Sequence, residues 1–500
     1  MKPPAGPALI GLDLGTTVCR SYVFDGTLEV LGSASRHLPL VTLSGTEIEQ
    51  SAEGWWDASV EVIRESLQAA GIPADCVKAI SVSSQGISFV PVDRSCRPMR
   101  PALSWMDTRA RAQRGRVTET LGDEAVFAVT GKRCNEGYAL PKLLWLAENQ
   151  AQVYESCHRI LMPLDFITAR LTGEYVTDHT MASGTMYYDV TRREWSHRIL
   201  DAFALDAGKL PAVRQGGSAV GSLRPEAAEA LGLPRGVVVC LGGQDQKVAA
   251  LAAGIDLDRT TISLGTAMAI EQNSLSPVLD PGMRIPCFAG LLAGDWVLEG
   301  VAICCSILDW ARNALFPAAS YDELNRMAEE AESRPDAPFL LPFFSGELSP
   351  WYSPQSRGTL HGLDLSTTPG QIVRAVFEGI AFLVRANMEV MAEVSRPVAE
   401  LRIFGGGSRS DTWCQVIADV TQRPLGTLKT SECAAAGAAI LAGLGSGLYR
   451  DVREPQSHMR LRRSFPPREN RRSSYDERYA RFQDLRVRLT ANETRTEEAG

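Results

Sequence analysis

The chain has 500 residues, of which 45% are hydrophobic and 22% are charged. This composition excludes disordered, collagen-like and fibrous proteins, and the length predicts two domains because single cores rarely grow beyond about 250–300 residues. Lys and Arg number 51 against 59 Asp and Glu, which gives a net charge of −8. We therefore expect no nucleic-acid partner, and a small-molecule enzyme is the favoured class.

The cysteines and the apolar segments indicate in which cellular compartment the protein is expected. The eleven cysteines are scattered without a C-x-x-C pair, and the six histidines show no metal-ligand spacing. An odd number of unpatterned thiols is typical of a reducing cytoplasm. The amino terminus has no apolar stretch of signal-peptide length, and residues 434–448 are too short and Gly-rich to span a bilayer, which needs about 20 residues. The sequence predicts a cytoplasmic protein with no membrane partner.

The first half of the sequence alternates strand and helix patterns. An apolar run over residues 8–14 ends at Gly15, and an alternating run follows at residues 19–24, which predicts a strand, a tight turn and a second strand. Apolar residues at three- and four-residue spacing predict a helix over residues 55–70. The other predicted elements are a strand at 77–83, helices at 142–149 and 164–171, and a strand at 237–241 followed by an Ala-rich helix.

The second half opens with the same device as the first. The strand, Gly-Thr turn and strand recur at residues 261–268, with an offset of 250 residues between Gly15 and Gly265. A repeat at the midpoint of the chain suggests two related halves. The elements predicted after it are a helix at 303–312, a Pro/Ser-rich loop at 342–358, a long helix at 369–394, a strand at 401–404, helices at 411–417, 433–442 and 475–489, and a frayed polar tail.

The first Gly-Thr turn is a candidate phosphate site. It reads Asp13-Leu14-Gly15-Thr16-Thr17. Glycine allows a turn in which backbone N–H groups point outward together and bind an anion, and the two hydroxyls can donate to phosphate oxygens. A carboxylate at the preceding strand end can hold a hydrated Mg²⁺ ion. The alternative is an ordinary hairpin with a polar turn.

A second Gly-rich turn lies late in the chain. The GGGS segment at residues 405–408 follows a strand and precedes a helical pattern, an arrangement that brings backbone close to a nucleotide at a helix amino terminus. Neither G-x-G-x-x-G nor the P-loop pattern occurs, which disfavours Rossmann and P-loop folds. A plain connecting loop is an equal alternative.

Asp245 is the candidate general base. It follows a buried strand within the LGGQDQ segment, and an acidic residue at the carboxyl end of a strand is well placed for proton transfer in a cleft. The residues alone favour the more common alternative, an amino-terminal cap for the helix that follows.

Polar and aromatic residues between positions 83 and 109 are candidates for sugar binding. Trp105 offers a flat face to sugar C–H groups, while Gln85, Asp107 and Arg109 can address hydroxyls. Surface or capping positions are the alternative for each of them. The basic run at residues 460–472 is interpreted as a solvated face.

At this point the motifs resemble those of a known family, the FGGY carbohydrate kinases, and most closely its xylulokinase-like branch. The resemblance covers residues 10–489. Its most specific part is GTLHGL at residues 358–363 continuing to QIVRAVFE at 371–378, which fits the second family signature in full. The first signature is matched less cleanly at residues 142–149, where Ala139 occupies a position usually held by Pro, Ser or Thr. The supporting matches are IGLDLGTT, SWMDTR, ASGT, SLGT and GGGSRSDTWCQ.

The resemblance implies an α/β fold of two actin-like (RNase H-like) ATPase domains with a central interdomain cleft. The amino-terminal domain would span residues 1–255 and bind the sugar, the carboxyl-terminal domain would span 256–490 and bind the nucleotide, and 491–500 would be a flexible tail. It makes Asp245 the catalytic base rather than a cap, and it makes ATP and Mg²⁺ the cofactors. The remaining roles implied are the metal ligand Asp13, the sugar contacts Gln85, Gly86, Trp105, Asp107 and Asp245, and the nucleotide contacts Gly15, Thr16, Thr17, Gly265, Thr266, Gly406, Gly407, Ser408 and Asp411.

The expected activity is transfer of the γ-phosphoryl group of ATP to a hydroxyl of a pentulose such as xylulose or of a related ketose. Two departures leave further substrates open, such as ribulose, erythritol or a glycerol-like polyol. Gly86-Ile87 stands where xylulokinases usually carry Met-His, and GGQDQ stands where xylulokinases typically carry Gly-Asp-Asn. A glycerol kinase would carry Arg-Glu in place of Gly86-Ile87, which disfavours glycerol itself. A non-catalytic sugar or nucleotide sensor and an actin- or chaperone-like ATPase are the competing functions for such a fold. The partners expected are the sugar and ATP, and a homodimer is compatible with the sequence.

Overall fold

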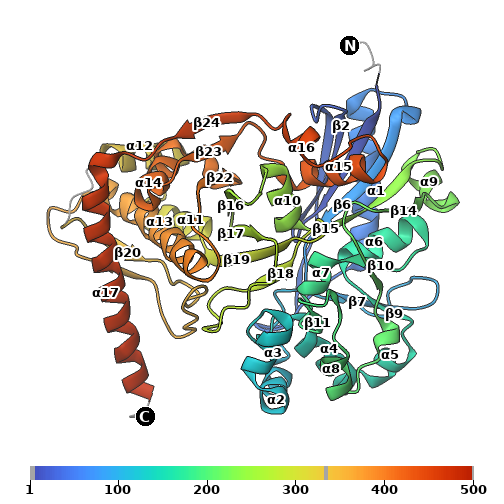
Figure 1. Cartoon of the computed structure of the whole chain (residues 1–500), viewed down its shortest axis with the longest axis horizontal. Helices are drawn as coiled ribbons and strands as arrows, with labels where there is room; N and C mark the ends of the chain where they lie inside the picture. The colour runs from blue at the N-terminus through green and yellow to red at the C-terminus, as the bar shows by residue number, and fades with distance from the viewer. Residues whose placement is uncertain (1–5, 332–335, 498–500) are drawn as a thin grey trace.

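The chain folds into two α/β halves that lie side by side (Figure 1). The structure is a computed structural model, and it describes residues 6–331 and 336–497. Each half is built around one large mixed β-sheet, which confirms the predicted fold class of two α/β domains. The predicted crossing near residue 255 lies between helix α10 (Asp245–Ala253) and strand β16 (Arg259–Leu264).

The sheet of the first half is centred on β1 (Ala8–Leu14), whose nearly continuous apolar run is buried on both faces. On one side of β1 an antiparallel meander continues into β2 (Val18–Asp25) and β3 (Val30–His37). On the other side, β6 (Val77–Ser84) and β15 (Val238–Gln244) run parallel to β1, and β14 (Ala219–Ser222) closes the edge. The helices of this half are α1 (Ala52–Ala70), α2 (Arg111–Leu121), α3 (Asp123–Thr130), α4 (Ala139–Asn149), α5 (Ala151–Ser156), α6 (Pro163–Thr172), α7 (His179–Ser183), α8 (His197–Ala202) and α9 (Pro225–Leu231).

The sheet of the second half repeats this plan. From β16 an antiparallel meander leads into β17 (Ala267–Ser274) and β19 (Trp296–Ile303), with β18 (Cys287–Ala289) at the edge. On the other side of β16 lie the parallel strands β22 (Glu400–Phe404) and β23 (Leu425–Leu428). The shared strand order supports the two related halves predicted from the repeated turn. The helices are α11 (Cys305–Leu315), α12 (Tyr321–Glu330), α13 (Pro369–Val394), α14 (Asp411–Thr421), α15 (Cys433–Gly445), α16 (Arg453–Gln456) and α17 (Arg472–Glu497).

Two helices join the halves at their junction. Helix α15, from late in the chain, packs on β1, β6 and β15 of the first sheet, and α10 packs between α15 and β16 of the second sheet (Figure 1). Close backbone approaches require glycine here: a Cβ on Gly11 of β1 would lie 2.0 Å from the Ala435 carbonyl oxygen, and a Cβ on Gly437 would lie 2.0 Å from that of Val248. The apolar side chains of α10 and α15 form a core cluster distinct from the cores of the two halves.

The carboxyl-terminal segment agrees with the sequence-based expectations only in part. The basic run at 460–472, interpreted as a solvated face, is largely exposed, but it also contains edge strand β24 (Leu461–Phe465), which pairs with β23. Its Arg468 pairs with Asp419, which is fully buried. Helix α17 continues to Glu497, past the helix end predicted at residue 489 and into the tail predicted to be flexible. The last part of that tail, residues 498–500, lies outside the described residues.

Two further observations concern the helices and the cysteines. Within residues 6–331 and 336–497, none of the helices combines the length and apolar character that crossing a bilayer requires. All eleven cysteines fall in the described segments and all are free thiols.

Candidate active site

Most of the predicted chemical groups of the first half lie at one edge of its sheet. Strands β1, β6 and β15 run parallel, and their registers align Leu14 with Ser84 and Ser84 with Gln244. Asp13 and Asp245 therefore both lie at the carboxyl ends of parallel strands, which is where open α/β sheets bind their ligands. They are near enough that the charge of Asp13 raises the pKa of Asp245.

Asp245 is the first residue of α10, and its carboxylate bonds only its own neighbours among the described residues. The side-chain Nε2 of Gln244 and the backbone N–H of Gln246 both donate to Oδ1, at 2.6 and 2.8 Å. The N-cap position belongs to Gln244, which makes no side-chain capping bond, so Asp245 is not the N-cap residue, although its carboxylate accepts one N–H of the first turn. Burial, reinforced by Asp13, raises the pKa of Asp245 to about 7. A carboxyl group with that pKa is suited to accept a proton near neutral pH.

Asp13 lies one residue before the end of β1, beside Ser83 of β6 and Arg20 of β2. Its Oδ2 lies 3.5 Å from Arg20 Nη1. Burial raises the pKa of Asp13 to about 6, Arg20 opposes this shift, and the negative charge of Glu432 adds to it. The charge of Asp13 thus acts on Asp245, and the charge of Glu432 acts on Asp13. Among the described residues, no three His, Cys, Asp or Glu side chains cluster closely enough to form a metal site, so the carboxylate of Asp13 fits a Mg²⁺ ion that keeps most of its water ligands.

The first Gly-Thr turn is a hairpin held by side chains from other elements. The backbone N–H of Gly15 donates to the Val18 carbonyl (3.1 Å) and closes the turn. Nε2 of Gln50 donates to the carbonyl of Thr16 (2.7 Å), and Nε1 of Trp105 donates to its hydroxyl (2.9 Å). Since Trp105 was predicted as a sugar contact and Thr16 as a phosphate contact, these bonds bring the two predicted sites together. The side chain of Thr17 is exposed beside them.

Gln50 is a residue that the motifs did not reveal. It ends β5 (Ile48–Gln50) and is only 2% exposed. Besides its bond to Thr16, its Oε1 accepts from Nε2 of Gln85 (2.9 Å) and from the indole Nε1 of Trp55 (2.8 Å). One buried amide therefore fixes the phosphate-side turn, a predicted sugar contact and helix α1. No local pattern in the sequence signals this, because Thr16 and Gln85 are 34 and 35 residues away from Gln50 and only Trp55 is close in sequence.

The turn after β6 carries the other predicted sugar contacts. Gln85 is 2% exposed, so its side chain belongs to the support of the site. A Cβ on Gly86 would meet Cγ of Gln244 at 3.1 Å, which puts Gly86 beside the start of α10. Ile87 follows with φ of +70°, a strained conformation for a β-branched residue that is typical of functional sites.

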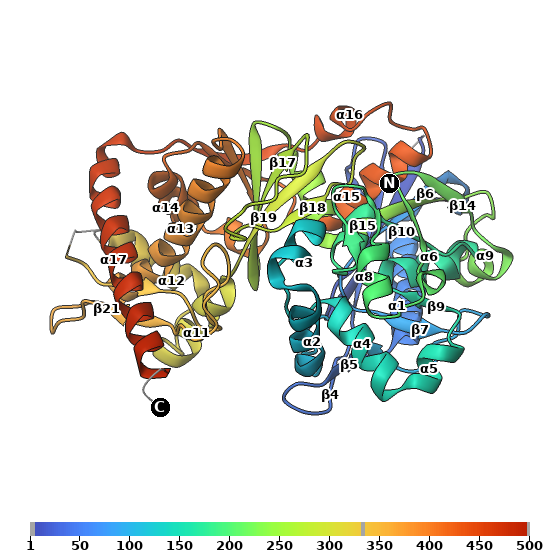
Figure 2. The ribbon, with the colours of Figure 1, turned by 60° about the horizontal axis from the view of Figure 1, so that its bottom comes forward.

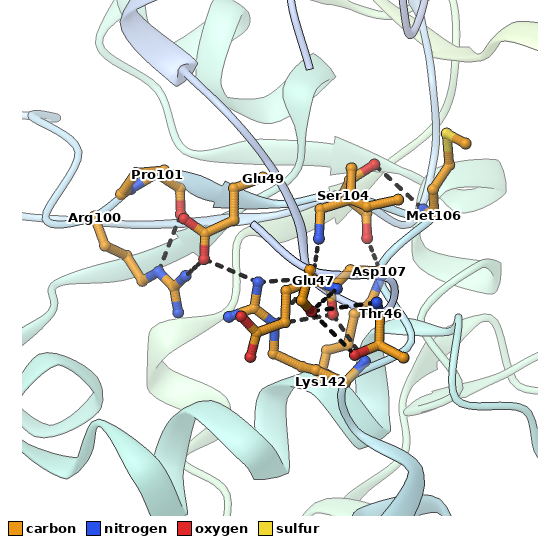
Figure 3. A network of polar contacts seen from close by, with 12 residues as sticks. Thr46, Glu47, Glu49, Arg100, Pro101, Ser104, Met106, Asp107 and Lys142 are labelled. Carbon is orange, nitrogen blue, oxygen red and sulfur yellow. Dashed lines mark hydrogen bonds and ion pairs between the residues drawn. The ribbon is translucent and has the colours of Figure 1, made fainter. Parts of the chain in front are cut away.

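Asp107 belongs to a network of polar contacts that also includes Glu49, Arg100, Ser104 and Lys142 (Figure 3), and Arg109 donates to its carboxylate. Asp107 is fully buried; its carboxylate accepts from the N–H of Ile48 (2.7 Å) and pairs with Arg109 (2.8 Å). Glu49 pairs with Arg109 and Arg100. Asp107 thus supports the loop that carries Trp105. The prediction that its side chain contacts the sugar directly does not fit the full burial of this side chain. Lys142, whose pKa burial lowers to about 7, donates to the Ser104 carbonyl at 2.7 Å in the same network.

The second Gly-Thr turn and the GGGS turn meet in the other half. Gly265 and Thr266 join β16 to β17, and the N–H groups of Cys305 and Cys304 donate to their carbonyls (2.9 and 3.1 Å). Gly405 has φ of +89°, and a Cβ there would lie 2.8 Å from the Leu264 carbonyl oxygen. The two turns, predicted as one nucleotide site, are therefore in contact.

The remaining predicted nucleotide contacts lie along the same turn. Gly406 is exposed, Gly407 is buried against Leu264, and the Ser408 hydroxyl donates to the Gly405 carbonyl (2.7 Å). Asp411 begins α14, and its carboxylate pairs with Arg462 (2.6 Å) and Arg463 of β24. These two arginines belong to the run interpreted as a solvated face, and their side chains are indeed 37% and 58% exposed. The strand pairing that brings them to Asp411 has no signal in the local sequence.

Known proteins share this arrangement over nearly the whole chain. Residues 8–252 match the N-terminal domain, and residues 260–446 the C-terminal domain, of the FGGY family of carbohydrate kinases. A xylulose kinase of Bacillus subtilis is 30% identical over 448 residues, covering 89% of this chain and 90% of that protein.

Solved structures give the same picture. A xyloylose kinase from Brucella ovis superposes with a TM-score of 0.89 at 28% identity, over 97% of this chain and 99% of that one. A gluconate kinase from Lactobacillus acidophilus reaches 0.90 at 25% identity, over 97% and 98%.

Proposed function

The chain belongs to the FGGY family of carbohydrate kinases, and we propose that it transfers the γ-phosphoryl group of ATP to a hydroxyl of xylulose or of a closely related ketose. The observation that carries the proposal is the Asp13–Asp245 pair at the carboxyl edge of the first sheet, with burial raising the pKa of Asp245 to about 7. Relatives named xylulose kinases support the sugar. A gluconate kinase is structurally as similar as the xyloylose kinase, so the substrate test includes a sugar acid. The Gly86-Ile87 pair is the reason that the test also includes other ketoses.

Asp245 acts as general base in this proposal. The sugar hydroxyl, bound against Gly86 and Trp105, loses its proton to the Asp245 carboxylate as its oxygen attacks the γ-phosphorus atom. The bond from that phosphorus to the β,γ-bridging oxygen breaks, and ADP leaves. Phosphoryl transfer depends mainly on positioning and charge stabilisation. Thr16 and Thr17 would donate to the transferred group, and their turn is held by Gln50 and Trp105.

The second half supplies the nucleotide site. Gly265 and Thr266 would contact the phosphates, and Gly406, Gly407 and Ser408 would line the nucleotide, supported by the contact between the two turns. Asp411 would act there through the arginines that it holds, since Arg462 also donates to the Ser408 carbonyl (3.1 Å). Asp13 would hold Mg²⁺, which when bound shields the negative charge of the phosphates. A cytoplasmic location agrees with the eleven free thiols.

A coupled ADP-release assay tests the substrate. We expect the highest kcat/KM with xylulose among xylulose, ribulose, gluconate, erythritol and glycerol, all at saturating Mg-ATP. Preference for another member would move the substrate but keep the kinase. Equal ADP release with and without every sugar would overturn the kinase proposal in favour of an ATPase or sensor.

Asp245→Asn tests the base. Because a general base contributes about 10²- to 10⁴-fold, we expect kcat to fall at least about 10³-fold while nucleotide affinity, measured by calorimetry, persists. The base works only when ionised, so kcat/KM of the wild type falls as pH drops below its pKa of about 7. Asp206→Asn, at an exposed turn, is the control and should change neither. A kcat within tenfold of the wild type for Asp245→Asn would exclude Asp245 as the base.

A further inference from the structure

A buried charged cluster lies where α10 meets the sheet of the second half. Lys247, in the first turn of α10, is 2% exposed. Its Nζ lies 3.0 Å from Oε1 of Glu271 and forms a second ion pair with Glu299. Glu271 is on β17 and Glu299 on β19, the strands at the junction between the halves (Figure 2). Lys247 therefore links an element of the first half to two strands of the second.

The two carboxylates face each other directly in the sheet. The antiparallel register of β17 and β19 pairs Glu271 with Glu299, and both are under 9% exposed. Like charges directly opposite on neighbouring strands are destabilising, and buried carboxylates need a cation. Burial and the charge of Glu299 raise the pKa of Glu271, while Lys247 lowers it. The second sheet thus carries a repulsive pair, and in the described part of the chain the ion pairs that relieve it come from Lys247 of α10.

An aromatic ring and a second lysine complete the cluster. Nζ of Lys247 lies 4.0 Å from the ring centroid of Phe288 on β18, and Nζ of Lys132 lies 3.7 Å from the same centroid. Lys132 donates to the carbonyls of Thr130 (3.1 Å) and Cys287 (3.0 Å). The two lysines are therefore buried over the same aromatic ring. Of the two, Lys247 is the one whose ammonium group is within ion-pair distance of Glu271 and Glu299.

The cluster connects the element that carries the proposed base to the strand that follows the proposed phosphate turn. Asp245 precedes Lys247 by two residues at the start of α10, and Glu271 is on the strand that leaves the Gly265–Thr266 turn. A shift of about 1 Å between reacting groups can cost about 10²-fold in rate. Whatever fixes α10 on β17 and β19 therefore fixes the base relative to that turn.

We propose that Lys247 is a positioning residue, which bridges Glu271 and Glu299 and so holds Asp245 in register with the Gly265–Thr266 turn. The inference rests on the proposed function, since it takes Asp245 as the base and the turn as a phosphate contact. Lys247 touches neither substrate in this role.

Lys247→Met and Lys132→Met form a matched pair of variants. Each removes a buried ammonium group that lies over Phe288, so each should lower the melting temperature. We expect Lys247→Met to lower kcat about 10- to 100-fold with the KM for sugar and ATP changed less than threefold, and Lys132→Met to keep kcat within twofold of the wild type. An unchanged kcat in folded Lys247→Met, or an equal loss in Lys132→Met, would overturn the inference.

A triple variant separates positioning from stability. Lys247→Met combined with Glu271→Gln and Glu299→Gln removes the repulsion together with the bridge, so the melting temperature should return toward that of the wild type while kcat stays low. Recovery of kcat along with stability would show that Lys247 acts only on the fold and would overturn the positioning role.

Amide hydrogen exchange of residues 244–248 distinguishes this inference from the proposed function. We expect faster exchange there in Lys247→Met and wild-type exchange in Lys132→Met, whether or not a sugar is phosphorylated. If the wild type phosphorylates no sugar, the proposed function fails but faster exchange still supports the bridge. Unchanged exchange in Lys247→Met overturns the bridge even where the wild type is an active kinase.

Discussion

The two Gly-Thr turns have the same backbone plan but are held in different ways. The first, between β1 and β2, receives side-chain hydrogen bonds from Gln50 and Trp105 and one main-chain bond, from the N–H of Leu38 to the Thr17 carbonyl (2.7 Å). The second, between β16 and β17, receives the backbone N–H groups of Cys304 and Cys305 and the hydroxyl of Ser306, at the start of α11. Similar local structure thus depends mainly on specific side chains in one half and mainly on the main chain in the other.

The difference follows from what lies beside each turn. Both side chains also reach the proposed sugar side. Gln50 accepts a hydrogen bond from Gln85, and the exposed ring of Trp105 is itself a proposed sugar contact. The first turn can therefore respond to the sugar. Main-chain hydrogen bonds form with almost any residue. The second turn therefore suits the nucleotide, which stays the same whichever sugar is phosphorylated. We expect substitutions around the first turn to impair transfer and those around the second to be tolerated.

Gln50→Met is the sharpest test of this contrast. Methionine keeps the approximate volume but leaves the Thr16 carbonyl, the Gln85 amide and the Trp55 indole without their partner. Each buried group left without a hydrogen bond costs about 1–3 kcal/mol. We expect kcat/KM for the sugar to fall about 10- to 100-fold and the melting temperature to drop, as measured by steady-state kinetics and calorimetry.

Gln113→Met provides the matched control. Gln113 is also a nearly buried glutamine of the first half, but its Nε2 donates to Glu148 on α4 (2.7 Å), away from the turn. The Gln113→Met variant should be less stable than the wild type but keep kcat/KM within about twofold of it. Equal kinetic losses in the two variants would break the contrast, because the effect would then come from stability alone.

Local patterns were sufficient to predict much of the fold and part of the site. The long helix predicted over 369–394 is α13 with the same bounds, because a capping box at Thr368 and Gln371 marks its start. Strands that end in glycine-containing turns gave the positions of Asp13, Gly15, Gly265 and Asp245 at strand ends, while the role of Asp245 as a base came from the family resemblance. These features are encoded within a few residues, so the sequence reveals them.

Long-range contacts could not be predicted in this way. The burial of Asp107 depends on Arg109 and on the Ile48 N–H from a segment 59 residues away. The pairing of Asp411 with Arg462 depends on β24 joining the sheet. The role of Gln50 depends on three elements meeting. In each case tertiary structure decides the partner of a polar group, and no local pattern signals it.

Trp105→Phe should have a smaller effect than Gln50→Met. Phenylalanine keeps an aromatic face for the sugar but cannot donate to the Thr16 hydroxyl. Trp105 is 42% exposed, so water can replace the lost bond and the net cost is about 0.5–1.5 kcal/mol. We expect kcat/KM for the sugar to fall about 2- to 10-fold, with the KM for ATP unchanged. An effect on the KM for ATP alone would place Trp105 on the nucleotide side and contradict its position here.

Ser306→Ala should have the smallest effect of all. Its hydroxyl donates to the Thr266 carbonyl at 2.8 Å, but that carbonyl also accepts from the Cys304 N–H. Because the main-chain bond remains and Ser306 lies near the surface, we expect the KM for ATP and kcat to stay within about twofold of the wild type. A tenfold rise in the KM for ATP would show that the second turn also depends on a side chain. The two turns would then differ in which substrate they serve rather than in how they are held.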